Sequence, residues 1–362
     1  MWPVFSFSAA DGAIAQTLTL ADPQISPDGS RVALLVGHND FDHDSVHVQA
    51  VLIDVAGGGM HTLPVPQTDI AFVRWSPRAD RLAYLAGADG EPKQLYIIFP
   101  SDVRARKLTN APQGVDYFAW RPDGNAIAYD TEDSPPQRRG SARFNSSFEV
   151  GDNDYRATTQ PLPSHLWLVR TDGSAPTPLT TGASMLPSGS LSLSQPYLDA
   201  LIAPQHFPDQ FFCWAGNGGS IAYTKAPDAY DTHWDEAVME LRDLATGRER
   251  ALTRHNGLEA GCDTSPDGKR VAYWYPHDGK PLAASSIFST DFSGGVNGLE
   301  VTLRGDCASD FNLNVVRRNI ERIIDLLQRD NSDYGGHRVA AIRKLDEGRE
   351  MLKAAIAWDN TH

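Results

Sequence analysis

The stretch Ile25-Ser26-Pro27-Asp28-Gly29-Ser30-Arg31-Val32-Ala33-Leu34 recurs along the chain in recognisable copies. In each copy a short turn is followed by an alternation of apolar, small and aromatic residues. The second, third and fifth copies keep most of these features, whereas the fourth is worn and has lost its proline. The later copies begin at Trp75, Trp120, Trp214 and Thr264.

The physics of one copy predicts a hairpin. Proline presets φ for a turn, aspartate bonds its own backbone, and glycine supplies the positive φ that closes the turn. A second alternating ribbon follows each copy, at residues 48–63, 94–108, 165–179, 238–252 and 287–303. Two hairpins give four strands per repeat, and Pro27, Pro77 and Pro122 are spaced 50 and 45 residues apart, close to the roughly 40–50 residues of known propeller repeats. The sequence therefore predicts an all-β propeller of about five visible four-stranded blades.

The spacing of the repeats also predicts the domain organisation. We expect an N-terminal segment at 1–16, the β-propeller at 17–312 and a helical hairpin tail at 313–362. Pro122 and Gly216 lie 94 residues apart with one clear outer ribbon between them, which predicts two insertions, at 130–164 and 183–208. The tail changes from a period of 2 to one of 3.6, as amphipathic helices do. Its two apolar stripes are Val316, Ile320, Ile323 and Leu327, then Ala341, Leu345, Leu352 and Ile356.

Composition narrows the range of partners. The 362 residues carry a net charge of −14, with 41% hydrophobic residues. Such acidity disfavours nucleic acid and anionic membranes as partners. No apolar run reaches the roughly 18 residues of a membrane helix, and the first residues lack the basic region of a secretory signal, so we expect a cytoplasmic protein as the sequence is written. The three cysteines Cys213, Cys262 and Cys307 follow the blade spacing and not a metal motif, and we expect core or strand thiols.

The repeats resemble those of a known family. Turns of the Ser-Pro-Asp-Gly type, with Trp before and Ala-Tyr after them, are similar to TolB-type propellers and to the N-terminal propeller of the prolyl oligopeptidase family of serine peptidases. Residues 148–155, followed by 163–169, are similar to the third-blade region of bacterial dipeptidyl aminopeptidase or acylaminoacyl-peptidase members. The resemblance covers about residues 17–312. It implies a propeller that caps an α/β-hydrolase domain and admits short peptides, in relatives that are often exported.

The chemistry of that family is not visible in these residues. An α/β-hydrolase needs Gly-x-Ser-x-Gly, which places its serine on a strained turn between strand and helix. The nearest approaches surround Ser184 and Ser220, and both lack the closing glycine. The family's propellers usually have seven or eight blades, so we also expect the propeller to be cut short. We predict no catalytic residues and no peptidase activity in this chain.

The residues suggest three candidate sites. Glu149, on the first insertion, is a candidate partner for the α-ammonium group of a peptide, by analogy with the family. Arg143 is a candidate partner for a peptide carbonyl or carboxylate. The alternative for Glu149 is a solvated loop acid. Residues 38–44 alternate His and Asp but do not match an EF-hand, so we expect neither metal nor cofactor.

These observations leave three hypotheses for function. The first is a non-catalytic propeller that binds or gates peptides. The second is a TolB-like module that docks a protein partner, and the third is a truncated relic without a function of its own. The expected partner is thus a peptide or a protein, with no nucleic acid and no membrane.

Overall fold

The computed structural model describes most of the predicted propeller and part of the tail. Described are residues 18–40, 45–65, 69–88, 91–100, 104–144, 147–148, 150, 159–182, 186, 211–277, 279–280, 285–293 and 299–300, and in the tail 324, 328, 339, 342–346, 348–351 and 353. The chain divides into two compact units, residues 1–300 and 301–362. The predicted boundaries after residues 16 and 312 lie outside the described residues.

The first two repeats form one continuous sheet. Blade 1 consists of β1 (Leu18–Ile25), β2 (Arg31–Asp40), β3 (Ser45–Asp54) and β4 (Met60–Thr62). Blade 2 consists of β5 (Asp69–Trp75), β6 (Leu82–Gly87), β7 (Gln94–Ile98) and β8 (Arg106–Lys107). A parallel pairing of Val48 with Asp69 joins the two blades into an eight-stranded sheet.

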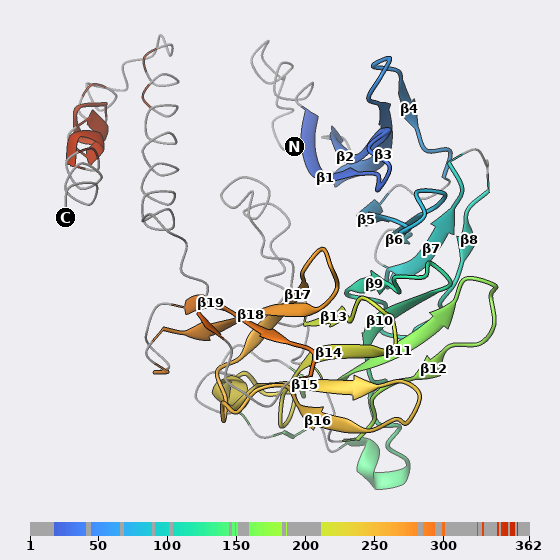
Figure 1. Cartoon of the computed structure of the whole chain (residues 1–362), viewed down its shortest axis with the longest axis vertical. Helices are drawn as coiled ribbons and strands as arrows, with labels where there is room; N and C mark the ends of the chain where they lie inside the picture. The colour runs from blue at the N-terminus through green and yellow to red at the C-terminus, as the bar shows by residue number, and fades with distance from the viewer. Residues whose placement is uncertain are drawn as a thin grey trace, which may run out of the picture. The chain divides into compact units, whose positions relative to one another are not determined.

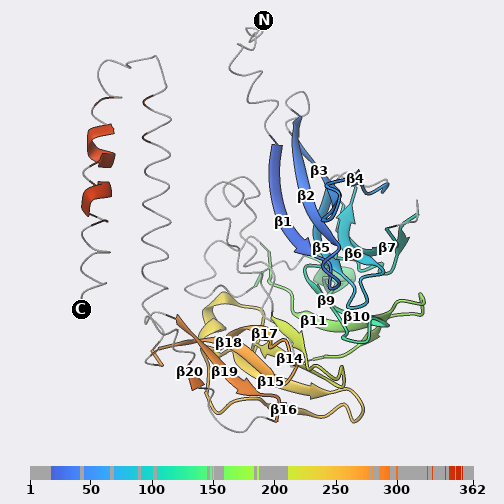
Figure 2. The same ribbon diagram turned by 45° about the horizontal axis from the view of Figure 1, so that its top comes forward.

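The next three repeats form separate four-stranded sheets. Blade 3 consists of β9 (Phe118–Trp120), β10 (Ala126–Glu132), β11 (Ser164–Arg170) and β12 (Thr177–Pro178). Blade 4 consists of β13 (Phe212–Trp214), β14 (Ser220–Lys225), β15 (Val238–Asp243) and β16 (Glu249–Ala251). Blade 5 consists of β17 (Ala260–Thr264), β18 (Arg270–Pro276), β19 (Ser285–Asp291) and β20 (Leu299–Glu300). The predicted all-β propeller with four-stranded blades is confirmed, and the blades follow one another around an arc (Figures 1 and 2).

The repeated turn forms as its residues dictate. In blade 1 the Ser26 hydroxyl donates to the Asp28 carboxylate at 2.6 Å, the Gly29 amide donates to the Ser26 carbonyl at 2.8 Å, and Gly29 has φ of 71°. Blade 2 holds the same left-handed position with Ala79, at φ of 57°, where a side chain costs about 1 kcal/mol. The worn fourth copy still turns, with Gly218 at φ of 66°.

Apolar cores fill the spaces between consecutive blades. One core joins each pair from blades 1 and 2 to blades 4 and 5, which makes four cores among the described residues. Strand β6 is buried along its whole length, because its alternate side chains enter the cores on both sides. Ala83 and Leu85 face blade 3, whereas Leu82 and Tyr84 face blade 1.

The residue before each turn ties its blade to the preceding one. The indole Nε1–H groups of Trp75, Trp120 and Trp214 donate to the carbonyls of Gln24, Arg74 and Ala119, at 3.1, 3.2 and 3.1 Å. The fifth copy has threonine at this position, and the Thr264 hydroxyl donates to the Trp214 carbonyl at 2.7 Å. The recurring tryptophan is therefore both a packing residue and a hydrogen-bond donor between blades.

The prediction of free thiols is wrong for two of the cysteines. Cys213 on β13 and Cys262 on β17 form a disulfide, although both are buried on strands as expected. The spacing of 49 residues places the two cysteines one blade apart, on inner strands that lie in contact. Cys307 lies outside the described residues.

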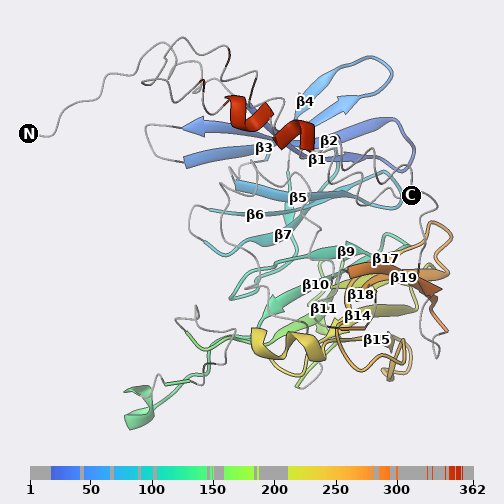
Figure 3. The same cartoon turned by 90° about the vertical axis from the view of Figure 1, so that its left-hand side faces the viewer.

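The first insertion contains a short 3-10 helix, η1 (Gly140–Phe144). This helix is fully exposed and projects from blade 3 (Figure 3). Of the second insertion, only Leu186 is described. Leu186 is completely buried and pairs with Ser164. The remainder of residues 183–208 lies outside the described residues.

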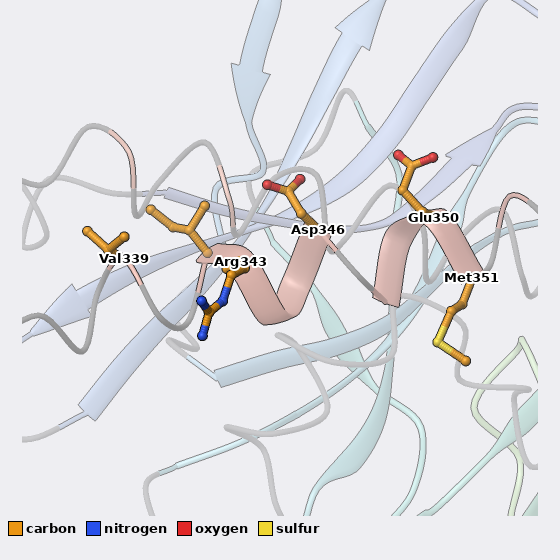
Figure 4. Close-up of a pocket in the computed structure, with 6 residues that line it drawn as sticks. Val339, Arg343, Asp346, Glu350 and Met351 are labelled. Atoms are coloured by element: carbon orange, nitrogen blue, oxygen red, sulfur yellow. The ribbon is translucent and has the colours of Figure 1, made fainter.

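The described residues of the second unit are helical. The predicted hairpin lies mostly outside them and stays a prediction. Val339, Ile342 and Met351 line a shallow apolar surface there, with Arg343, Asp346 and Glu350 at its sides (Figure 4). Within the described part of the chain, no helix has the length and apolarity that a bilayer span requires.

Candidate functional site

The first strands of the blades bring charged and aromatic side chains together. Strands β1 and β5, β9 and β13, and β13 and β17 are in contact, as expected for the innermost strands of a propeller (Figure 1). Along them, residues of blades 1, 2 and 3 are in contact, and Asp263 of blade 5 lies near enough to influence Tyr117. We call the set the inner-strand cluster: Asp22, Phe72, Arg74, Tyr117 and Asp263.

The centre of this cluster is an ion pair between two blades. Nη1 of Arg74 lies 2.7 Å from each carboxylate oxygen of Asp22. The Asp22 carboxylate also accepts the Val73 amide at 3.0 Å and the Gln24 side-chain amide at 2.9 Å. Both charged side chains are about one-fifth exposed. A half-buried pair with this many partners is ordered by hydrogen bonds as well as by charge.

Aromatic rings extend the cluster towards blade 4. The Arg74 guanidinium lies 3.8 Å from the centroid of the Phe72 ring, a cation–π contact. Phe72 packs edge-on against Tyr117 at 4.8 Å, and Tyr117 packs edge-on against Phe212 at 4.9 Å. These rings give the inner strands an apolar wall beside the ion pair.

The pKa of Tyr117 depends on the charged groups around its phenol. Burial raises the pKa of its phenol, the Arg74 guanidinium lowers it, and the carboxylates of Asp263 and Asp130 raise it further. Groups on blades 2 and 5 are therefore close enough to influence one phenol on blade 3. Asp263 is exposed, and its carboxylate accepts the amide of its neighbour Thr264 at 2.8 Å.

Bulges position the cluster residues. The registers of β1, β5 and β17 each shift just before the turn, and the backbone is left-handed at Asp22, Phe72 and Gly261, with φ of 49°, 56° and 72°. A bulge redirects side chains and increases the local twist. The left-handed conformation of Asp22 and Phe72 is uncommon for residues with a side chain.

A second buried polar group connects blades 4 and 5. The Glu259 carboxylate, which is fully buried, accepts the Met239 amide at 2.7 Å, the Thr253 hydroxyl at 2.6 Å and Nδ1 of His255 at 2.7 Å. His255 stacks on Tyr275 with ring centroids 3.7 Å apart. Because the carboxylate is fully bonded inside a connection between blades, we assign this group a structural role.

The two residues expected to bind a peptide do not meet in a described site. Arg143 is exposed on η1, and its guanidinium lies 4.5 Å from the Phe144 ring centroid. Glu149 lies outside the described residues. Both assignments therefore stay predictions.

Neither serine considered for catalysis has catalytic surroundings among the described residues. Ser184 lies outside them. Ser220 begins β14 and lines a cavity of about 410 Å³, together with Asp243, Arg248 and Glu249. No described histidine lines this cavity, so no imidazole is placed there to act as a base.

The expectation that the chain binds no metal rests on residues 38–44, of which residues 41–44 are not described. Nε2 of His47 lies 3.1 Å from the Asp40 carboxylate in an exposed pair. Across the described ranges, no group of three or more His, Cys, Asp and Glu side chains is arranged to hold a metal ion.

Comparison with known proteins gives a consistent result at the level of fold. No known protein-family profile matches the chain. An acylaminoacyl peptidase in complex with Z-Gly-Gly-Phe-chloromethyl ketone aligns with a TM-score of 0.54 at 15% identity, over 79% of this chain and 40% of that one. The chain shares the fold of that part of the peptidase. The resemblance predicted from the repeated turns is thereby confirmed for the fold.

Two further proteins are similar to this propeller. The uncharacterised peptidase YuxL of Bacillus subtilis is 32% identical over 114 residues, which are 32% of this chain and 17% of that protein. A putative TolB from Agrobacterium tumefaciens aligns with a TM-score of 0.47 at 15% identity, over 78% of this chain and 80% of that one. The chain thus spans less than a fifth of the curated relative and about two-fifths of the acylaminoacyl peptidase.

The inner-strand cluster was missed from the sequence, although a signal for it exists. Asp22, Phe72 and Tyr117 all stand five residues before the turn position that Pro27, Pro77 and Pro122 occupy. At this position blades 1 to 5 carry Asp22, Phe72, Tyr117, Phe211 and Gly261, so three of the five residues are aromatic. Blade 1 is the one that carries a charged residue there, whereas Tyr117 and Phe211 are buried in the core of blades 3 and 4.

Proposed function

We propose that this propeller binds short peptides at the inner-strand cluster, through their amino terminus, and has no peptidase chemistry of its own. The observation that supports the proposal is the convergence of Asp22, Arg74, Tyr117 and Asp263 from four blades. Asp22 and Arg74 neutralise each other, which leaves the exposed Asp263 carboxylate as the negative group of the cluster. A carboxylate next to an aromatic wall suits an α-ammonium group followed by an apolar side chain.

The absence of peptidase activity is proposed on separate grounds. The 362 residues contain no Gly-x-Ser-x-Gly, and the described serine nearest to that pattern, Ser220, shares its cavity with acids and arginines. The solved relative that carries a peptide chloromethyl ketone is an acylaminoacyl peptidase. A peptide is therefore the ligand class to test first.

The test is calorimetric titration with a short apolar peptide, in forms with a free and with an acetylated amino terminus. We expect only the free form to bind, and Asp263→Asn to weaken binding about tenfold, which corresponds to about 1.4 kcal/mol. Asp123→Asn removes another exposed carboxylate, from the turn of blade 3, and should leave the affinity unchanged.

Two results would contradict the proposal. Equal binding of the free and acetylated peptides would remove the role of Asp263. Reproducible cleavage of an aminoacyl reporter by the purified chain, lost in Ser220→Ala, would show that the chain is an enzyme.

A further inference from the structure

Blade 1 has two apolar faces, of which only one is covered by described residues. Cross-strand pairing places Ala33, Leu52 and their neighbours on the face towards blade 2, where they are buried. The same registers place Leu20 opposite Val36, Ile25 opposite Val32, and Val32 opposite Ile53, all on the other face. On that face Leu20 and Ile25 are 68% and 70% exposed. We call the apolar part of this face the open face of blade 1, and it consists of Leu20, Ile25, Val32, Leu34, Val36, Val51 and Ile53, of which only Val36 is buried.

The repeat shows what this face would contact. Measured from the turn, Leu20 corresponds to Ile70 of blade 2, and Ile25 corresponds to Trp75. Ile70 and Trp75 pack against the preceding blade and are only 2% and 8% exposed. The open face is thus the surface that every later blade uses to dock on its predecessor.

The sequence of the central strand agrees with this interpretation. A sheet with one solvated face alternates polar and apolar residues, whereas a sheet covered on both faces has a continuous apolar run. Residues 32–36 of β2 are Val-Ala-Leu-Leu-Val, which resembles the fully buried β6 and not an edge sheet. Blade 1 is built as an internal blade.

The last blade presents the matching surface. Val271 and Tyr273 of β18 belong to the core shared with blade 4. The intervening Ala272 and Trp274 pair with Ser289 and Ile287, on the face turned away from blade 4. Ala272 and Ile287 are half-buried, so part of the far face of blade 5 is accessible and apolar.

The two ends of the arc are therefore the two halves of one interface, which the chain already forms between each pair of consecutive blades. We propose that two copies of this chain associate head to tail, with the far face of blade 5 of one copy on the open face of blade 1 of the other. A two-fold arrangement makes this contact twice and leaves neither end exposed.

The chemistry of the open face fits such an interface. Its named side chains are all apolar, and the ionisable residues His38, Asp40 and His47 of the same sheet face lie beyond them, towards the loop between β2 and β3. At the position before the turn, blade 1 has Ile25, whereas the later blades have a tryptophan or a threonine that donates a hydrogen bond to the preceding blade. Because Ile25 has no donor, a partner at this junction need not supply an acceptor. Burial of apolar area drives the association.

Analytical ultracentrifugation of the purified chain tests the proposal. We expect a concentration-dependent species of twice the 39.5 kDa chain mass. The double variant Leu20→Asp/Ile25→Asp should raise the dimer dissociation constant at least a hundredfold. The control Val55→Asp/Phe144→Asp introduces the same charges at side chains 58% and 75% exposed outside the open face, and should dimerise like the parent chain.

A second variant separates head-to-tail association from other dimers. Ile287→Asp changes only the face of blade 5, and we expect it to weaken the dimer by at least tenfold. Unchanged dimerisation of Ile287→Asp would indicate that two open faces of blade 1 pack on each other, and would overturn the proposal. The proposal would also be overturned if the parent chain itself stayed monomeric at all accessible concentrations. This test is independent of peptide binding, so either proposal can fail alone.

Discussion

At the scale of single residues, one repeated position carries a charged side chain in blade 1 and an aromatic side chain in blades 2 and 3. The position five residues before the turn proline holds Asp22, Phe72 and Tyr117 in the first three blades. In blades 2 and 3 the ring packs against the core of blades 3 and 4, whereas in blade 1 the Asp22 carboxylate pairs with Arg74 of the next blade. The inner-strand cluster arises because the same repeated position carries a charge in blade 1 and a ring in blades 2 and 3.

A residue-scale prediction concerns the tryptophans between blades. Trp120 and Trp167 are both half-buried and pack against the core of blades 2 and 3. The Trp120 indole donates to the Arg74 carbonyl, whereas the Trp167 indole has no acceptor among the described residues. Trp120→Phe should therefore lower the free energy of unfolding by about 1–2 kcal/mol more than Trp167→Phe does, as a lost hydrogen bond implies. Urea denaturation checks this, and equal losses would contradict it.

A second residue-scale prediction concerns the acid of the first turn. The Ser26 hydroxyl, and then the amide and hydroxyl of Ser30, lower the pKa of Asp28 to about 2. Because the pKa is lowered on folding, the turn gains stability above the unfolded pKa of about 3.9, and this gain is lost as the pH falls towards 2.

Carboxyl NMR titration tests that assignment. We expect the Asp28 midpoint near 2 in the parent chain and a clearly higher midpoint in Ser26→Ala. Asp267, whose pKa is lowered chiefly by the Ser265 hydroxyl, should be unaffected by the same substitution and serves as the control. An unmoved Asp28 midpoint in Ser26→Ala would show that Ser26 does not set this pKa.

At the scale of elements, the contact between blades 4 and 5 differs from the others by being covalent. The disulfide joins β13 to β17 across 49 residues. Chain-entropy arguments assign a cross-link of this length about 4 kcal/mol, and strain or residual structure reduces the measured value. The bond also bears on localisation, because structural disulfides persist in oxidising compartments. We propose such a compartment for this chain, in place of the cytoplasm expected from its sequence.

The corresponding prediction is that a reductant lowers the free energy of unfolding by up to about 4 kcal/mol. Cys213→Ala/Cys262→Ala should show the lower stability from the start and no further response to the reductant. Urea denaturation with and without dithiothreitol checks both statements. Mass spectrometry after alkylation without reduction gives the number of free thiols, and labelling of Cys213 or Cys262 would contradict the bond and the proposed compartment.

At the scale of the whole molecule, the five blades form an arc with two different apolar ends. Closed propellers remove exposed sheet edges and faces by completing the ring. The structure has an apolar core between each pair of consecutive blades, and its described residues form no such core between blade 5 and blade 1. The head-to-tail dimer would bury these ends. The oligomeric state is therefore the property to measure first, before peptide binding.

The sequence alone determined what depends on local chemistry. Each Pro-Asp-Gly turn specifies a hairpin through its own dihedral angles and hydrogen bonds, so the order of residues is enough to locate the blades and their outer ribbons, including the worn turn at Gly218. Contacts between blades depend instead on how distant strands come together. The ion pair of Asp22 with Arg74 and the bond of Cys213 with Cys262 join residues about 50 positions apart, and the exposure of Ile25 depends on which sheet, if any, packs on blade 1. Only the tertiary structure decides these, because side chains so far apart along the chain meet through the packing of whole sheets.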